Sequence, residues 1–335
     1  MADRTKSRFP VIDSRTKMAT IFVGLALFVG AVFGASYVHW RGVGLLDPQD
    51  AHRRAVLKSS SLKIADRLIL AASALAEERG LTYAALQGAA PFGADARSKL
   101  NDLRRASNAS LDEAVRLIRT GTQIPTQVRF MTRLVDSQAL VNELRQQVDA
   151  WEPSQSSVQT IVLTRRWFQA ATRQLAATEE ALNAAHATIR TAGITPDIDV
   201  LLRLQRLAIV INDSVGRERA MVTAMLARKQ PLSDEEAYWG RASEDRVGHL
   251  WQQTKAQMVA QDLNPDVMQA MDSVARIYFI EMKAARRAVH DARIANVPYP
   301  VTPEQWFKKS TDAIAQMNRI GRTAGDIALS KLPGV

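Results

Sequence analysis

The sequence predicts an all-α protein in which an N-terminal transmembrane helix is followed by two pseudo-repeated, up-and-down four-helix bundles. Three observations lead to this prediction. The 16 glycines and 12 prolines among the 335 residues gather in short clusters, and the stretches between them are rich in strong helix formers. One uncharged stretch near the N terminus is long enough to cross a membrane. Two segments of the first half also match two segments of the second half at nearly the same sequence offset.

The predicted membrane helix covers residues 18–40. Residues 18–38 carry no charge, and these 21 positions at about 1.5 Å each reach across a hydrocarbon core. Tyr37 and Trp40 stand at the downstream boundary, where amphipathic rings favour the interface. Basic residues in the segment 1–17 favour a cytoplasmic tail. We therefore expect a single-pass signal anchor in a bacterial inner membrane, with the soluble part in the periplasm. A cleaved signal peptide is the alternative, but its apolar core would be shorter, and no clean small-x-small site follows.

Small residues recur every four positions within this span. Ala26, Gly30 and Gly34 fall on one face of the helix, which lets a second helix approach closely. We expect a homodimer formed through this face. The alternative is that glycine is simply common in membrane helices.

Glycine and proline clusters divide residues 47–330 into about eight long helices. The breaks fall near residues 88–93, 121–125, 151–153, 193–196, 230–232, 264–265 and 297–303. Short connections between long helices imply antiparallel neighbours. We therefore expect one soluble domain over 47–330, with halves of about 47–192 and 196–330.

An internal repeat supports the division into halves. Residues 78–86 (ERGLTYAAL) match residues 218–226 (ERAMVTAML) at an offset of 140. A helix that carries Trp-Phe followed by Thr, Leu/Ile and Ala matches at an offset of 139, with Trp167 aligned to Trp306. Two matches in the same order at nearly one offset indicate two related units.

Helical periodicity places one arginine of each half on an apolar stripe. Arg79 falls near the centre of the stripe of its helix, and Glu218 and Arg219 straddle the stripe of theirs, whereas Arg217 points to the far face. A buried guanidinium keeps its proton and therefore needs a carboxylate, carbonyl groups or a bound anion. Two hypotheses follow. Either Glu78 and Glu218 neutralise the two arginines, or the arginines converge between the bundles and clamp a small anion.

The same residues carry a family resemblance. Residues 78–82 (ERGLT) resemble the Lys-Glu-Arg-Gly-Leu-Ser signature of the nitrate- and nitrite-sensing (NIT) domain. Residues 216–220 (GRERA) are similar to its second Arg-Glu-Arg-Ala element, and residues 304–314 to its closing Trp-x-x-x-x-Thr-x-x-Ile helix. The resemblance covers residues 60–320 approximately. Glu77 stands where the signature has lysine, and Thr82 where it has serine.

The resemblance implies an all-helical sensor that binds nitrate or nitrite between two bundles, through arginines at Arg79 and Arg219. We expect the ligand site to comprise these two residues with Glu78, Glu218 and Thr82. Members of the family usually carry an output domain, and membrane-bound members usually carry a second span. Since neither is found here, we expect a separate signalling partner.

Other functional classes find little support. The five histidines show no paired ligand spacing, there is no cysteine, and no phosphate-binding glycine loop is present. We therefore expect no catalysis, no metal and no cofactor. The net charge of +10 arises from basic residues scattered among 34 acidic ones, so that no nucleic-acid partner is expected.

Two functions are consistent with these features. The first is a membrane-anchored sensory domain that binds a small anion and relays binding by movement of one bundle against the other. The second is a structural or adaptor protein that keeps the fold for protein–protein interaction without a ligand. In the second case, carboxylates would occupy both arginines.

Overall fold

All the described residues fold as helices and the turns between them. The computed structural model describes residues 48–87, 93–121, 125–152, 156–229, 234–258 and 265–331, and no strand occurs among them. Residues from Ala55 onward form one compact unit. The unit that precedes it ends at Arg54, and the structure describes only its last residues, at the start of helix α2 (Pro48–Leu86).

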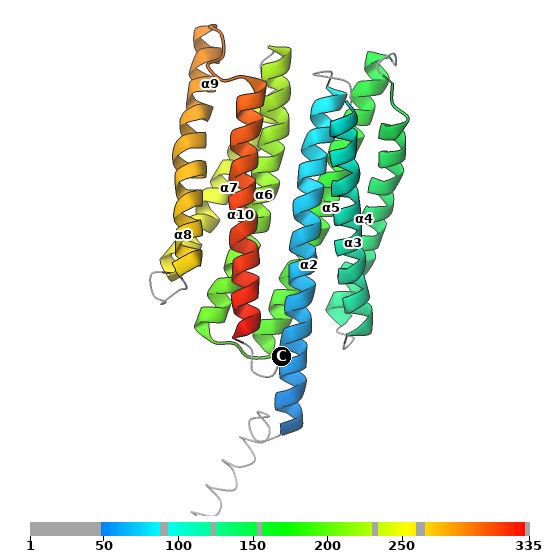
Figure 1. Cartoon of the computed structure of the whole chain (residues 1–335), viewed down its shortest axis with the longest axis vertical. Helices are drawn as coiled ribbons and strands as arrows, with labels where there is room; N and C mark the ends of the chain where they lie inside the picture. Colours follow the sequence, from blue (N-terminus) through cyan, green and yellow to red (C-terminus); the bar gives the residue numbers. More distant parts are fainter. Residues whose placement is uncertain are drawn as a thin grey trace, which may run out of the picture. The chain divides into compact units, whose positions relative to one another are not determined.

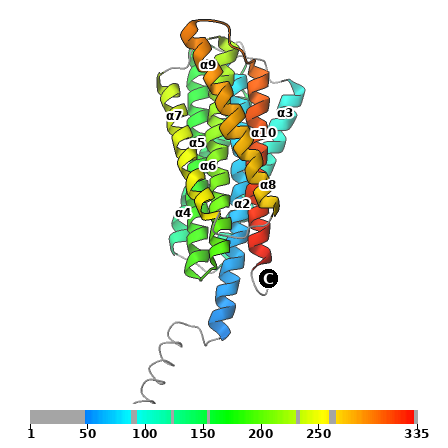
Figure 2. The same ribbon diagram turned by 90° about the vertical axis from the view of Figure 1, so that its left-hand side faces the viewer.

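Consecutive helices run up and down along a common direction (Figures 1 and 2). Helix α2 is followed by α3 (Ala94–Thr120), α4 (Pro125–Asp149), α5 (Ser157–Thr191), α6 (Pro196–Arg228), α7 (Asp234–Met258), α8 (Pro265–Val274), the π-helix η1 (Ala275–Met282), α9 (Lys283–Ala295) and α10 (Pro303–Ser330). The segments α8, η1 and α9 follow one another without a break and form a single rod. The all-α prediction is confirmed for this part of the chain, and the helix ends fall at or close to the predicted glycine and proline clusters.

Helix ends follow from local sequence. Proline occupies the first helical turn of α6 and α10, where its missing N–H is not needed. Thr302 closes a capping box at α10, in which its hydroxyl accepts from the Gln305 backbone and the Gln305 side chain accepts from the Thr302 backbone. Asn296 ends α9 in the left-handed conformation that asparagine tolerates.

Among the described residues, two large hydrophobic clusters fill the unit, and a small third cluster consists of Tyr83, Ala220 and Ala224. One is built almost entirely from α2, α3, α4 and α5 and includes Trp167, and the other is built almost entirely from α6 to α10 and includes Trp306. Both tryptophans are at most 1% exposed, so that each anchors its cluster. The matched Trp-Phe helices therefore occupy corresponding places in two cores.

The helices α2, α6 and α10 meet through small and polar side chains. A Cβ atom at Gly321 would lie 2.9 Å from the Ala208 Cβ atom, so α10 needs glycine there to approach α6 this closely. Asn318 of α10 accepts hydrogen bonds from Ser73 of α2 and Asn212 of α6. These contacts join α10 to both α2 and α6.

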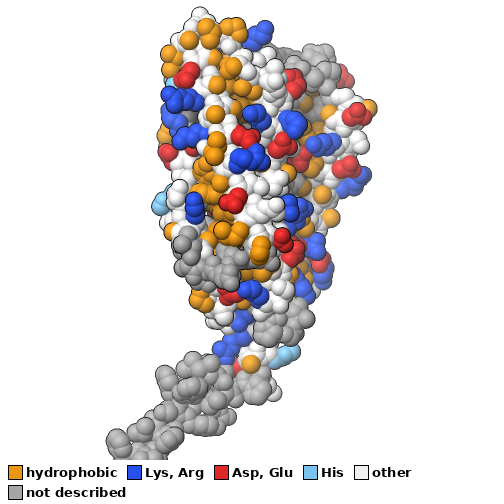
Figure 3. Space-filling model, turned by 60° about the vertical axis from the view of Figure 1, so that its left-hand side comes forward, with side chains coloured by type: hydrophobic (Ala, Val, Ile, Leu, Met, Phe, Trp, Pro, Cys, Tyr) orange, Lys and Arg blue, Asp and Glu red, His pale blue; other side chains and the backbone are white. Residues whose placement is uncertain are grey.

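Charged side chains of both signs are interspersed on the face shown in Figure 3, with hydrophobic side chains between them. The basic excess is therefore not gathered into a continuous patch on this face.

None of the described helices is both long enough and apolar enough to cross a membrane. The predicted span at residues 18–40 lies outside the described residues, as does its small-residue face at Ala26, Gly30 and Gly34.

Candidate anion-binding site between α2 and α6

Each of the two central helices buries one arginine against the other helix. Arg79 of α2 and Arg219 of α6 are both 0% exposed, as the stripe geometry predicts. A Cβ atom at Gly80 would lie 2.9 Å from Nη2 of Arg219, and one at Gly216 would lie 3.2 Å from Nη2 of Arg79. Glycine at these positions therefore makes room for a guanidinium from the opposite helix.

The two guanidinium groups lie in matching cradles. Arg79 stacks on the Phe168 ring at 5.1 Å from its centroid, and its Nη1 donates to the Thr172 hydroxyl at 3.0 Å. The repeat supplies the counterpart groups in the second half, where Arg219 stacks on Phe307 at 4.8 Å and its Nη1 donates to Thr311 at 2.9 Å. An aromatic face and a hydroxyl fix the orientation of each cation without removing its charge.

Arg79 is neutralised by a carboxylate from the opposite helix. Its Nη1 lies 2.7 Å from Oδ1 of Asp213, and its Nη2 donates to the Asp213 backbone carbonyl at 3.0 Å. The other oxygen of Asp213 accepts from Arg217, one turn further along α6. Burial opposes the ionisation of Asp213, but the charges of Arg79 and Arg217 outweigh it, so that the pKa of Asp213 lies below its usual value.

Arg219 has no such partner. Among the described residues, no carboxylate forms an ion pair with its guanidinium, and its Nε donates to nothing. Its Nη2 makes only a long contact of 3.5 Å with the Ala76 carbonyl. Burial lowers the pKa of Arg219 to about 10, with Glu77 acting against the shift and Arg79 adding to it. The group stays charged at neutral pH, and its charge is left uncompensated by any ion pair in the part of the chain that the structure describes.

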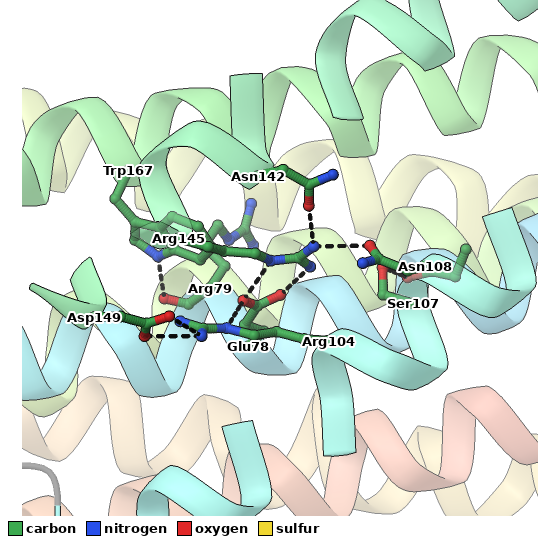
Figure 4. Close-up of polar contacts among 10 residues, drawn as sticks. Glu78, Arg79, Arg104, Ser107, Asn108, Asn142, Arg145, Asp149 and Trp167 are labelled. Atoms are coloured by element: carbon green, nitrogen blue, oxygen red, sulfur yellow. Dashed lines mark hydrogen bonds and ion pairs between the residues drawn. The ribbon is translucent and has the colours of Figure 1, made fainter. Parts of the chain in front are cut away.

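Glu78 does not pair with the adjacent Arg79. It turns toward α3 and α4, where its carboxylate is held by Nη2 of Arg145 at 2.6 Å and by Nε of Arg104 at 2.9 Å (Figure 4). Arg104 also forms an ion pair with Asp149, and Arg145 also donates hydrogen bonds to Asn108 and Asn142. Glu78 is 0% exposed and Arg145 is buried, whereas Asp149 is exposed, so this ionic network runs from the first core to the surface.

Glu218 is likewise held within its own half. Nη2 of Arg286 lies 2.7 Å from the Glu218 carboxylate. Arg286 also stacks on the Tyr278 ring at 4.5 Å, and its Nη1 lies 4.0 Å from the Glu244 carboxylate. Burial works against the Arg286 charge, but the Glu218 carboxylate outweighs it and raises the pKa of Arg286.

One of the two hypotheses about charge compensation, and the predicted direction of Arg217, are therefore wrong. Glu78 and Glu218 do not neutralise Arg79 and Arg219, because each glutamate is paired with an arginine from another helix of its own half. Arg217 is not a solvated side chain on a far face, since it is only 19% exposed and is paired with Asp213.

Thr82 lies in the same stretch of α2 as Arg79. It is 0% exposed, and its hydroxyl has no hydrogen-bond partner among the described residues. The structure thus brings Arg79 and Arg219 together between α2 and α6, and it places Glu78 and Glu218 in separate ionic networks behind them.

Several polar residues of this region were not identified from the sequence as site residues. Thr172 and Thr311 lie on the matched Trp-Phe helices, so the repeat itself contained the signal for them. Arg145 and Arg286 are related by nearly the same offset, and the repeat could have found them too. Asp213 has no acidic counterpart in the first half, where position 73 is a serine, and nothing in the sequence pointed to it.

The arrangement offers hydrogen-bond donors and positive charge. Two guanidinium forks, two threonine hydroxyls and two aromatic faces suit a small planar oxyanion, since such an anion accepts in the plane of the fork. Within the described residues, no group of three or more potential metal ligands occurs.

Comparison with known proteins identifies the family and the fold of this chain. The sequence model of the family described as nitrate and nitrite sensing matches residues 70–327, well over half of the chain. No curated relative matches the chain in sequence. The solved structure of the NasR transcription antiterminator shares the fold, with a TM-score of 0.64 and 17% sequence identity over 89% of this chain and 76% of that one. Because the family model matches well over half of the chain, including both buried arginines, the chain belongs to the nitrate- and nitrite-sensing (NIT) domain family.

Proposed function

We propose that this chain is a sensory domain that binds a small oxyanion of the nitrate or nitrite type at Arg79 and Arg219, between α2 and α6. The observation that carries the proposal is the Arg219 guanidinium, which is fully buried, oriented by Phe307 and Thr311, and without a carboxylate among the described residues. A buried cation in this state is stabilised by a bound anion. The family to which the chain belongs supports the choice of ligand.

Relay of the signal would use the same two helices. An anion that engages Arg79 and Arg219 together would change the contact between α2 and α6, and so move one bundle against the other. Helix α2 is the element that leads back toward the N-terminal segment. A separate signalling partner would read this movement.

Nitrate titration of the full chain in detergent tests the binding site. Nitrate and nitrite should raise the melting temperature of the wild type, and calorimetry should detect saturable binding. The Arg219→Gln variant should lose this response, because it removes the unneutralised charge. Arg206→Ala is the matched control, since Arg206 lies on the same helix with 47% of its side chain exposed. An Arg219→Gln variant that responds to nitrate as strongly as the control would overturn the proposal.

Anchoring at residues 18–40 and a periplasmic soluble part belong to the same proposal. The chain contains no cysteine, so a single Lys308→Cys substitution on the exposed surface of α10 provides a unique label site. The protein should stay with membranes after alkaline extraction. A membrane-impermeant maleimide should label the introduced thiol in intact spheroplasts. Labelling only after lysis would refute the periplasmic orientation.

Dimerisation through Ala26, Gly30 and Gly34 is the remaining part of the proposal. Replacing Gly30 by Ile would block close approach of two spans. Crosslinked dimers of the full chain in membranes should then decrease, whereas an unchanged dimer yield would exclude this face.

The adaptor function has one specific observation in its favour. Arg79 is already neutralised by Asp213, as a structural ion pair would be. If the chain is an adaptor, nitrate will bind neither the wild type nor any arginine variant, so the nitrate titration separates the two functions.

A further inference from the structure

The two arginine cradles differ in one charge. Asp213 is related to Ser73 by the repeat offset of 140, so the two occupy corresponding positions on α6 and α2. The Asp213 carboxylate binds Arg79 of the opposite helix. The Ser73 hydroxyl instead lies within hydrogen-bond distance of the Ile69 carbonyl, at 2.8 Å, and of the Asn318 side-chain oxygen, and it offers Arg219 no carboxylate.

The Asp213 carboxylate resembles the proposed ligand in its chemistry. It is a planar, singly charged oxyanion that accepts from a guanidinium, as nitrate and nitrite do. It accepts a hydrogen bond from Nη1 of Arg79 at 2.7 Å. An external oxyanion that approached Arg79 would therefore meet a site already filled by the protein.

Asp213 also has an alternative partner. Its second oxygen is bonded to Arg217 on its own helix, and its side chain is 12% exposed. If Arg79 were released, the carboxylate would keep a cationic partner within one turn of α6 and would not be left as an unpaired buried charge.

We propose that Asp213 is a built-in competitor for the anion site: it holds Arg79 in the ligand-free protein, and the ligand must displace it onto Arg217 to engage both arginines. This inference rests on the proposed function of the Arg79–Arg219 site. It assigns Asp213 a role in setting both the affinity and the response. The Arg79–Asp213 pair joins α2 to α6, so its replacement by a ligand changes the contact through which the two bundles meet.

The test compares nitrate affinity in the wild type and in Asp213→Asn, using calorimetry on the full chain in detergent at constant ionic strength. If Asp213 leaves Arg79 free in about a tenth of the wild-type molecules, the apparent affinity for nitrate is about ten-fold weaker than the intrinsic one. Removal of the carboxylate should therefore tighten the apparent affinity about ten-fold. Asp199→Asn is the matched control, because Asp199 lies on the same helix and pairs with Arg190 and Arg203 instead. The control should bind nitrate as the wild type does.

A gain-of-competitor variant keeps the proposal testable if Asp213→Asn does not fold. Ser73→Asp places a carboxylate at the corresponding position of α2, where it should neutralise Arg219. The apparent affinity for nitrate should then weaken about ten-fold. Arg217→Ala should also weaken binding, because Asp213 loses its second partner.

The outcomes separate this inference from the proposed function. Tighter binding in Asp213→Asn supports the competitor role. If the wild type binds nitrate and a folded Asp213→Asn binds it equally or more weakly, the competitor role is wrong while the anion site stands. If Asp213→Asn shows no cooperative unfolding transition, it is not folded and Ser73→Asp becomes the test. An unchanged nitrate affinity in Ser73→Asp would then overturn the competitor role. If neither nitrate nor nitrite binds any of these proteins, the proposed function and the inference both fail.

Discussion

The two halves of this protein bury corresponding arginines in similar surroundings, but only one of the two guanidinium groups is paired with a carboxylate among the described residues. In the first half, Arg79 is neutralised by Asp213, whereas in the second half Arg219 keeps a phenylalanine face and a threonine hydroxyl but has no carboxylate among the described residues. The aromatic ring and the threonine hydroxyl that position the guanidinium are therefore the same in both halves. The carboxylate that compensates its charge differs between them. The proposed anion site depends on this difference between the halves.

The carboxylates behind the arginines show the same divergence. Glu78 is held by Arg145 and by Arg104, whereas Glu218 is held by Arg286 and has Glu244 nearby. Positions 104 and 244 are related by the repeat offset of 140, so an arginine in one half corresponds to a glutamate in the other. In the first half one glutamate is thus paired with two arginines, and in the second half one arginine faces two glutamates.

The largest expected effect concerns these two glutamates. Glu78→Gln should lower the free energy of unfolding by about 3–5 kcal/mol, because it leaves two largely buried arginines without their shared carboxylate. Glu218→Gln should cost less, about 1–3 kcal/mol, since Glu218 and Arg286 are 14% and 15% exposed and Glu244 remains. Urea unfolding of both variants measures the difference. Equal losses would mean that the two networks support their bundles alike.

A smaller effect should appear as pH dependence from the first half. His186 of α5 is 1% exposed and bonds Gln205 of α6, whereas the corresponding position of α10 is Gly325, which packs against the same glutamine. Burial lowers the pKa of His186 to about 3, against 6.5 in the unfolded chain. Below 6.5 only the unfolded state takes up this proton, so stability is full above that pH and falls as the pH decreases toward 3.

Between pH 6.5 and 5 the loss should reach about 1.6 kcal/mol, since the slope approaches about 1.4 kcal/mol per pH unit only below pH 6.5. Carboxylates with lowered pKa values contribute only at more acidic pH, and Asp66, whose pKa is raised by burial, acts in the opposite direction. The comparison with a histidine variant therefore identifies the contribution of His186. His186→Gln should flatten the profile of unfolding free energy between these two pH values. His290→Gln, at an exposed position of α9, serves as the control. A wild type whose stability is unchanged from pH 6.5 to 5 would contradict the assignment.

The smallest effect on stability should accompany a large effect on binding. Gly80→Ala adds a Cβ atom 2.9 Å from Nη2 of Arg219, at the end of a long side chain, so the Arg219 guanidinium must shift. A gain of up to about 1 kcal/mol in helix propensity should offset much of the strain. Unfolding free energy should therefore change by about 1 kcal/mol or less.

Nitrate affinity should nevertheless fall by about ten-fold in Gly80→Ala, because a shift of roughly 1 Å misplaces a donor. Gly216→Ala should weaken binding less, since its Cβ atom would lie 3.2 Å from an Arg79 that Asp213 already fixes. Calorimetric titration of the two variants ranks them. The reverse order would indicate that Arg79, and not Arg219, is the principal anion ligand.

Much of the fold could be predicted because the helix-forming composition and the glycine and proline clusters between helices are local properties of the sequence. The breaks at glycine and proline clusters separate the observed helices, and the helical stripe correctly places Arg79 and Arg219 at 0% exposure. The repeat identified the helices that carry Trp167 and Trp306, and these proved to supply the aromatic and hydroxyl partners of the arginines.

The ion pairs could not be predicted in the same way. Glu78 stands next to Arg79 in sequence, yet its partners are 26 and 67 residues away, on α3 and α4. Asp213 lies 134 residues from the arginine that it neutralises. A helix fixes the direction of each side chain, but the distance to a partner depends on which helix packs opposite.

By itself, the sequence determined the helices, the relation between the two halves and the inward direction of both arginines, since these follow from periodicity and repetition within the chain. Only the tertiary structure decided that Arg79 receives a carboxylate, whereas Arg219 has none among the described residues. The reason is physical: burial depends on the phase of one helix, whereas charge compensation depends on the register of two.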